Sequence, residues 1–338
     1  MNYTVQIYSL LYEDFAISFQ TYLLYMKAGN NQDFGMNMSN DAETYALGRM
    51  YEFGITVEQD HHRAAELYIK AAKMGNEQAR EVFFFDFDLK QKVNTDMKRV
   101  ATIMEAAQLG YADAQYSLGG RYRAGVGMRK SYPAAFHWLS KAAEQGHVEA
   151  TYYLGAMYLR GRGTEVDVGK AKELTRKAAE LGCAPAQHEI GKVLLGEKDR
   201  KSEAIEWITR SSDNGYRIAQ FDLGTMYLQG DGVKFDPKLG MELLTSSAEK
   251  RYASAAYKLG EIFDKGQYGF KKDPEKAIKW YKRAQKIGYV GAELRLAQIY
   301  QNGEGVERDL FQCIKYYKLA DQHGWHYANN MLMEIFAN

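Results

Sequence analysis

A short motif, Leu-Gly-x-x-Tyr-x-x-Gly-x-Gly, returns at regular intervals and limits what this chain can fold into. Its copies begin at Leu47, Leu118, Leu154, Leu223, Leu259 and Leu296. The copies at Leu47 and Leu259 end at the first glycine of the Gly-x-Gly, Phe263 replaces the tyrosine in the fifth copy, and Ala297 replaces the glycine after leucine in the sixth. A chain that repeats one motif builds similar units that stack on their neighbours, because one unit alone cannot bury its apolar side. The motif therefore predicts an array of units rather than a single globular core.

A second motif, a pair of small residues followed three positions later by glycine, marks the end of each unit. Ala71-Ala72 with Gly75 and Ser211-Ser212 with Gly215 are two examples. The closing glycines are 33 to 37 residues apart, most often 36, and Arg251 takes the place of one of them. This spacing predicts eight units between about residue 40 and residue 324.

The run Gly230-Asp231-Gly232 fits a phosphate-binding loop, a calcium-binding loop or a turn between helices. A phosphate loop follows a strand and opens a helix, whereas apolar residues at helical spacing, Leu223, Met226 and Tyr227, precede these glycines. A calcium loop needs several oxygen ligands, and this run offers one carboxylate. We therefore interpret the run as a helix–turn–helix corner, in which glycine caps the first helix and Asp or Ser caps the second. The capping residues of the second helices are Asp60, Ser131, Asp167, Asp236, Asp273 and Asp309.

Composition favours an ordinary soluble chain. The 338 residues include 44 Lys plus Arg and 43 Asp plus Glu, and a net charge of +1 gives no global drive towards nucleic acid or an anionic membrane, although it leaves a local basic patch open. Cys183 and Cys313 are too far apart for a disulfide framework or a zinc site. The first residues lack a basic segment, and no run reaches the roughly 18 apolar residues that span a bilayer. We expect a cytoplasmic protein with no nucleic-acid, membrane or small-molecule partner.

The combined pattern resembles the Sel1-like repeat, a relative of the tetratricopeptide repeat. Residues 111–146 carry the resemblance most fully, in Ala114, Leu118-Gly119, Tyr122, Gly125-Val-Gly127, Ala135, Trp138, Ala142-Ala143 and Gly146. Trp207 and Trp280 recur at the position of Trp138. The resemblance implies an all-α fold, a right-handed α/α solenoid of antiparallel helix pairs. From their repeated spacing, Tyr122, Tyr158, Tyr227 and Tyr300 are expected in the core.

The repeat spacing also predicts how the chain is divided. The units are 40–75, 76–110, 111–146, 147–182, 183–215, 216–251, 252–288 and 289–324, preceded by an N-terminal helical cap or degenerate repeat at 1–39 and followed by a C-terminal capping helix at 325–338. Unit 76–110 is degenerate, because Phe84 replaces the motif glycine and the glycine turn is missing. Unit 183–215 is shortened, having lost three turn residues after Gly196.

Partner-binding residues are suggested by the resemblance alone. In the tetratricopeptide relatives the first helix of each pair lines a concave groove, and the residue three positions before the motif glycine faces it. That residue is Tyr45, Tyr116, Tyr152, His188, Phe221, Tyr257 or Leu294 in successive recognisable units. Aromatic rings suit a binding surface, but the same residues also fit a purely structural role. Variable groove-facing candidates are Arg49, Glu52, Arg123, Arg160, Lys192, Glu261, Asp264, Lys265 and Gln298, for which a solvated charged face is the alternative.

No catalytic or metal-binding set accompanies these residues. His61-His62 lacks a third ligand at useful spacing, and the sequence contains no Gly-x-Ser-x-Gly, His-Glu-x-x-His or phosphate-loop motif. The sequence thus predicts a bacterial, non-enzymatic scaffold or adaptor without cofactor or metal, which binds a protein or peptide in the concave groove. The alternative is a dedicated inhibitor, such as a bacterial toxin-immunity protein, or a secreted effector acting on host proteins.

Overall fold

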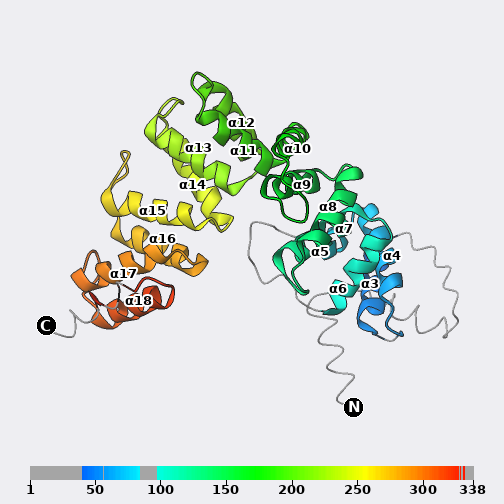
Figure 1. Cartoon of the computed structure of the whole chain (residues 1–338). Helices are drawn as coiled ribbons and strands as arrows, with labels where there is room; N and C mark the ends of the chain where they lie inside the picture. Colours follow the sequence, from blue (N-terminus) through cyan, green and yellow to red (C-terminus); the bar gives the residue numbers. More distant parts are fainter. Residues whose placement is uncertain (1–39, 56, 84–96, 327, 329, 332–338) are drawn as a thin grey trace, which may run out of the picture. The chain divides into compact units, whose positions relative to one another are not determined.

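The chain forms consecutive helices (Figure 1). A computed structural model describes residues 40–55, 57–83, 97–326, 328, 330 and 331, and all the regular secondary structure in them is α-helical. The helices are α3 (Asp41–Phe53), α4 (His61–Lys73), α5 (Glu77–Phe83), α6 (Met97–Gln108), α7 (Ala112–Ala124), α8 (Tyr132–Glu144), α9 (Val148–Arg160), α10 (Val168–Glu180), α11 (Ala184–Leu195), α12 (Lys201–Asp213), α13 (Arg217–Gln229), α14 (Pro237–Glu249), α15 (Ala253–Lys265), α16 (Pro274–Ile287), α17 (Val290–Asn302) and α18 (Leu310–Gln322). The predicted cap at 1–39, the aromatic run beyond Phe83 and most of the predicted closing helix lie outside the described residues.

Consecutive helices pack as antiparallel pairs, which confirms the predicted all-α solenoid fold. The most extensive contacts join α3 with α4, α7 with α8, α11 with α12, α13 with α14, α15 with α16, and α17 with α18. Within each of the two units below, second helices then pack on the first helix of the next pair, as α8 does on α9 and α14 does on α15. By its internal contacts the chain divides into two compact units, residues 1–175 and 176–338, and helix α10 contains the division.

Six of the helix pairs turn at the predicted glycine corner, with a left-handed glycine at Gly54, Gly125, Gly161, Gly230, Gly266 or Gly303. The last residue of α13 is followed by Gly230, whose φ of 67° is left-handed, and its backbone N–H donates to the Met226 carbonyl. The Asp236 carboxylate then accepts hydrogen bonds from the backbone N–H groups of Lys238 and Leu239, at 3.1 and 3.0 Å. The same side-chain cap forms at each of the other predicted residues, which are Asp60, Ser131, Asp167, Asp273 and Asp309. The corner prediction is confirmed.

The second glycine of the corner has a different purpose from the first. A Cβ atom added to Gly163 would lie 2.3 Å from the carbonyl oxygen of Tyr132, at the start of the preceding second helix α8. A Cβ atom on Gly305 would lie 2.1 Å from Pro274 Cβ, at the start of α16. At these corners the second glycine therefore lets the turn lie directly against the previous repeat.

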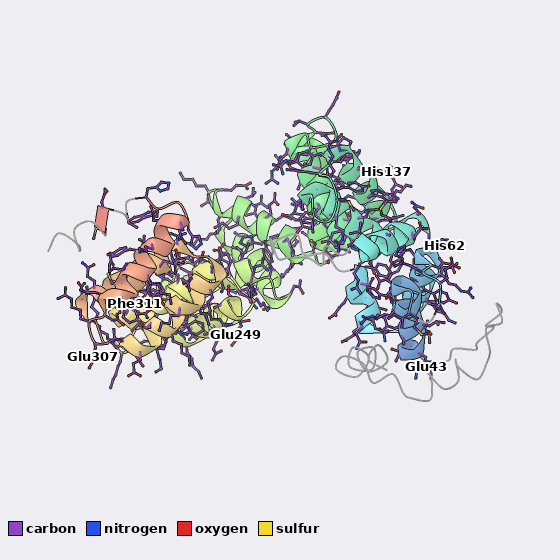
Figure 2. The ribbon with its side chains drawn as sticks, turned by 90° about the horizontal axis from the view of Figure 1, so that it is seen from below. Glu43, His62, His137, Glu249, Glu307 and Phe311 are labelled. Atoms are coloured by element: carbon purple, nitrogen blue, oxygen red, sulfur yellow. The ribbon has the colours of Figure 1, made fainter. Side chains whose placement is uncertain are left out.

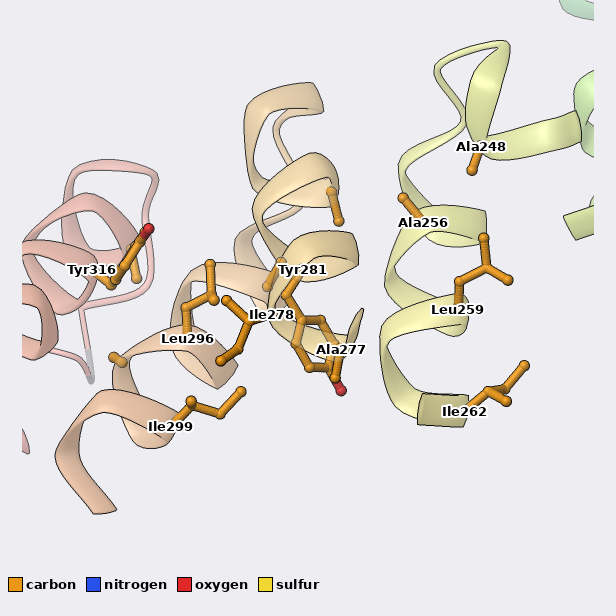
Figure 3. Packing of buried hydrophobic residues seen from close by; sticks show 14 of the residues in the cluster. Ala248, Ala256, Leu259, Ile262, Ala277, Ile278, Tyr281, Leu296, Ile299 and Tyr316 are labelled. Atoms are coloured by element: carbon orange, nitrogen blue, oxygen red, sulfur yellow. The ribbon is translucent and has the colours of Figure 1, made fainter. Parts of the chain in front are cut away.

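Within a pair, the motif glycine brings the two helices together. A Cβ atom on Gly119 would lie 2.7 Å from Leu139, and one on Gly260 would lie 2.6 Å from the Tyr281 ring. Figure 3 shows Tyr281 of α16 in this core, together with Leu259 and Ile262 of α15. Large side chains of the second helix thus pack onto the backbone of the first.

Buried polar side chains on the first helices join consecutive repeats. The Gln115 amide donates to the Ala107 carbonyl of α6 at 3.1 Å and accepts from the Gln145 amide at 2.7 Å. Gln187 and Gln220 make the same reach to Ala179 and Ser212, at 3.1 and 3.4 Å. Each of these carbonyls also accepts a hydrogen bond from the backbone N–H of the closing glycine, so the glutamine adds a second bond that ties the next repeat to the end of the preceding helix.

Two parts of the sequence-based picture need correction or refinement. Tyr122, Tyr158, Tyr227 and Tyr300 are partly buried at the edge of the core rather than inside it. At the end of unit 216–251, Arg251 takes a left-handed φ of 63° where other repeats have glycine. In the shortened corner of unit 183–215 the left-handed residue is Asp199, with a φ of 67°, and Gly196 has a right-handed φ of −82°.

The corner glycine can be tested by adding one methyl group. Gly163→Ala places a Cβ atom 2.3 Å from a backbone oxygen at a φ of +78°, so we expect the free energy of unfolding to fall by about 1–3 kcal/mol. Gly169→Ala is the matched control, because its nearest neighbour would be 3.5 Å away and α10 gains a better helix former, for a gain of about 0.5–1 kcal/mol. Denaturant unfolding followed by circular dichroism measures both. Equal effects of the two substitutions would contradict the assigned contact.

Candidate partner-binding site

The predicted aromatic stripe lies on the first helices, mostly at half-buried positions. Tyr116, Tyr152, His188, Phe221, Tyr257 and Leu294 are all partly exposed. Tyr45 differs, because it is only 7% exposed and packs on the Tyr68 ring with 5.4 Å between centroids. Six of the seven positions therefore keep some surface available for contact.

Most of these rings contact a second ring in the next repeat. Tyr116 stacks on His147 with centroids 4.4 Å apart, and Tyr257 stacks on Tyr289 at 4.6 Å. The contacts of His188 with Tyr216 and of Phe221 with Tyr252 are edge-on, at 5.5 and 5.3 Å. We call these eight residues the aromatic ladder: Tyr116 and His147 in the first unit, and His188, Tyr216, Phe221, Tyr252, Tyr257 and Tyr289 in the second.

The sequence analysis missed half of the ladder, although a signal for it was present. His147, Tyr216, Tyr252 and Tyr289 each stand at the N-cap of a first helix. Each also directly follows the closing glycine of a repeat, or Arg251 in its place. A recurring ring at that position marks the boundary between repeats, which is where the ladder contacts form.

The variable charged candidates are mostly paired within the chain. Lys192 and His188 both contact Asp222, at 3.4 and 2.9 Å. Burial alone would raise the pKa of Asp222, but the hydrogen bond from His188 and the charge of Lys192 hold it below its ordinary value. Glu261 pairs with Lys265 at 3.0 Å and with Lys258 at 3.7 Å. These ion pairs neutralise much of the charge beside the ladder in the second unit.

The remaining predicted residues are placed as follows. The guanidinium of Arg49 lies over the Phe53 ring at 5.2 Å, and that of Arg123 lies over Tyr153 at 5.5 Å. Arg160 and Gln298 are exposed. Both arginine–ring contacts fall within the first unit and form part of its surface.

Asp264 is a buried structural residue. Only 6% of it is exposed; its oxygens accept hydrogen bonds from Arg295 at 2.7 and 3.0 Å and from the Tyr281 hydroxyl at 3.1 Å. Burial alone would raise its pKa, but the bonds from Arg295 and Tyr281 hold the pKa below the ordinary value. The first unit repeats the arrangement with Glu52, which accepts from the Tyr68 hydroxyl at 2.7 Å and from Arg99 at 3.2 Å.

The two histidines and two cysteines that the sequence singled out have local surroundings. His61 lies 3.1 Å from the Thr102 hydroxyl, and His62 lies 3.3 Å from Glu105. Cys183 and Cys313 are buried thiols, and burial raises the pKa of Cys313 to about 11. Within the described ranges no three His, Cys, Asp or Glu side chains gather as a metal site would require. Each helix described is too short or too polar to cross a lipid bilayer.

The Asp264 cluster predicts a specific dependence of stability on pH. Asp264→Asn removes a buried carboxylate that pairs with Arg295, so we expect a loss of about 2–3 kcal/mol at neutral pH. A carboxylate whose folded-state pKa is depressed stabilises the fold above its unfolded pKa of about 3.9 and stops doing so as the pH falls further. The gap between wild type and variant should therefore shrink below about pH 4. Asp231→Asn, which breaks an exposed pair with Lys201, should leave the free energy of unfolding nearly unchanged. A gap that is constant with pH would contradict this prediction.

Comparisons with known proteins agree with the repeat and with the fold. The Sel1 repeat family profile matches residues 44–76, 112–147, 148–183, 184–216, 217–252, 253–286 and 290–320. The chain is 37% identical over 119 residues to chitin synthase regulatory factor 3 of Schizosaccharomyces pombe, covering 33% of this chain and 13% of that relative. The chain thus spans a small part of that relative's length.

Two solved structures are also similar. The crystal structure of a Sel1 repeat protein from Oxalobacter formigenes has a TM-score of 0.59 at 30% identity, over 67% of this chain and 94% of that one. A protective antigen of uropathogenic Escherichia coli with an SLR fold has a TM-score of 0.52 at 27% identity, over 94% of this chain and 67% of that one. Sel1 repeats generally mediate contacts between proteins and are generally not catalytic. Since the family profile matches most of its length, this chain belongs to the Sel1 repeat family.

Proposed function

We propose that the chain is an interaction scaffold that binds an extended segment of a protein partner along the first-helix face, in the concave groove that a solenoid of this family implies. The observation that carries the proposal is the aromatic ladder, in which rings from successive repeats meet at equivalent positions and stay partly exposed. Exposed rings of this kind offer large contact area together with a polar atom at the tip.

Pre-organisation supports this role. Ring–ring contacts already hold Tyr257 and Phe221 in place, so little side-chain freedom is lost when a partner covers them. The neighbouring charges are largely satisfied by pairs such as Lys192 with Asp222. A partner would then gain from apolar contact and hydrogen bonding at the rings rather than from its net charge.

The test of the proposal must distinguish specific contact with the ladder rings from non-specific binding to exposed apolar side chains. The wild-type chain is used to select ligands from a display library of random peptides, and the best peptide is labelled for fluorescence anisotropy. The triple variant Tyr216→Ala, Phe221→Ala and Tyr257→Ala removes one ring from each of the three ladder contacts of the second unit. It should bind the peptide at least about tenfold more weakly, because truncating a buried aromatic anchor that carries binding energy costs about 1 kcal/mol or more. The control variant Leu181→Ala, Phe235→Ala and Phe311→Ala removes exposed apolar side chains outside the ladder and should bind as the wild type does.

Thermal unfolding checks that each variant folds, and the three single substitutions replace the triple variant if it does not. Equal binding by the ladder and control variants would contradict the proposal. The dedicated-inhibitor alternative predicts one folded target at nanomolar affinity, whereas a scaffold predicts several ligands of moderate affinity. Bait experiments with the same variants in native lysate distinguish these two outcomes.

A further inference from the structure

One short stretch of the second unit is strongly basic. Residues 271–286, which comprise the end of the α15–α16 corner and nearly all of α16, hold seven basic and two acidic residues, a formal charge of +5. The whole chain has a charge of +1. The balance of the chain as a whole therefore hides a concentrated positive surface.

Several of these lysines form no ion pair with the described residues, although the charge of Lys272 helps to lower the pKa of Asp264. Lys271, Lys272, Lys279 and Lys286 are all exposed, and no ion pair in the described part of the chain involves them. Lys279 and Lys286 are seven residues apart on α16 and so lie on the same side of the helix. This contrasts with the first-helix face, where the charges beside the ladder are largely paired.

The other basic residues of the stretch are engaged locally. The Lys276 ammonium pairs with Asp273 at 2.8 Å, and the Arg283 guanidinium lies over the Trp280 ring at 5.4 Å. Lys282 lies over Tyr300, 5.6 Å from its centroid. The Lys276 charge is thus neutralised by Asp273, while Lys282 and Arg283 keep their charge but lie against aromatic rings. Among the residues that the structure describes, the other four lysines of the stretch have neither kind of contact.

The basic surface continues onto α18. The Tyr300 ring beneath Lys282 stacks on Tyr316 of α18 at 5.9 Å, and Lys315 lies over Tyr316 at 5.8 Å. Lys318, one turn further along α18, is exposed as well. We use the name basic surface for Lys271, Lys272, Lys279, Lys286, Lys315 and Lys318.

Acidic residues of the same unit do not cancel this charge. The repeat alignment gives α14 glutamates, Glu242 and Glu249, at the positions of Lys279 and Lys286 in α16. Glu249 and Glu307 are exposed on the second unit (Figure 2), and neither forms an ion pair with the basic surface. The charge reversal between α14 and α16 is therefore a property of this repeat and not of the second helices in general.

We propose that the basic surface docks an acidic segment of a protein partner. Charge complementarity selects the occupant, because unpaired lysines attract carboxylates and accelerate their encounter with the surface. Lysine presents a mobile point charge suited to scattered carboxylates, whereas phosphate recognition favours the rigid fork of arginine, and the one arginine here lies against Trp280. Lys282, Lys315 and Arg283 also cover the nearby rings Tyr300, Tyr316 and Trp280, which limits base stacking by a nucleic acid.

An anionic membrane fits this surface less well. None of the large apolar side chains of residues 271–286 is among the exposed ones, so α16 has nothing to insert into a bilayer. On α18 the exposed large apolar side chains are Leu310 and Phe311, and the vesicle measurement below tests whether these two can anchor the surface in lipid. The docking surface also lies on second helices, whereas the ladder lies on first helices and their N-caps. The two proposals therefore stand or fall separately.

The test uses the full chain and a defined acidic probe. The probe is a fluorescein-labelled peptide of about 12 residues with alternating glutamate and serine, which at about 3.3 Å per residue is longer than the roughly 21 Å of α16. The variant Lys271→Gln, Lys272→Gln, Lys279→Gln and Lys286→Gln should bind it about tenfold more weakly at low ionic strength, as expected for the loss of four exposed attractions. Binding by the wild type should weaken as salt is added.

The matched control removes four other exposed lysines. Lys70→Gln, Lys73→Gln, Lys172→Gln and Lys177→Gln lower the net charge by the same amount on α4 and α10, and should change the affinity less than about twofold. The ladder variant should bind the acidic probe as the wild type does, even if it loses its own ligand.

Three outcomes would overturn the proposal. The first is no binding of the acidic peptide at low ionic strength. The second is an equal loss in the α16 variant and the matched control, which would indicate attraction by net charge alone. The third is tighter binding of single-stranded DNA, or of vesicles containing phosphatidylserine, than of the acidic peptide, with the same dependence on Lys279 and Lys286.

Discussion

The array of repeats depends on the close contact between the two helices of a pair, which forms where the first helix has a glycine. At Gly48, Gly119, Gly191 and Gly260 an added Cβ atom would lie within 2.6 to 2.8 Å of a large side chain from the second helix of the pair. Those side chains, Tyr68, Leu139, Ile208 and Tyr281, are fully buried. In these pairs the close approach brings the two helices into one packed layer, and the rings and corners that meet the next repeat lie on that layer.

Sequence reasoning worked best where the cause is local. A left-handed glycine after a helix and an Asp before the next one act within a few residues, so the corners at Gly230 and Asp236 were predictable from a single copy. It failed where the cause is distant. Asp264 has the spacing of a groove residue, but Arg295, 31 residues further on, draws it into a buried pair. Tyr158 and Tyr300 have the spacing of core residues, but Lys170 and Lys282 lie over them at the core's edge.

The two faces of the second unit differ in how they treat charge. On the first helices, Asp222 and Glu261 each have a cationic partner, and the rings stay partly exposed between the pairs. On α16, Lys279 and Lys286 have no acidic partner and the rings lie under cations. One face therefore suits a partner that offers apolar groups, and the other suits a partner that offers carboxylates. The two proposed partners would therefore contact different helices of the second unit.

The second corner glycine has a consequence for anything that binds across several repeats. Gly163 and Gly305 rest on the starts of the preceding second helices, at Tyr132 and Pro274, without an intervening side chain. That contact fixes how closely these repeats approach the ones before them, and the approach of successive repeats sets the interval between successive rings of the ladder. The α15–α16 corner lacks the contact, because a Cβ atom added to Gly269 there would meet no neighbour within 4 Å. A partner with anchors at a different interval would fit one ring and miss the next. On the proposed function, the spacing of the repeats thus makes binding depend on the spacing of the ligand's anchor residues as well as on their chemistry.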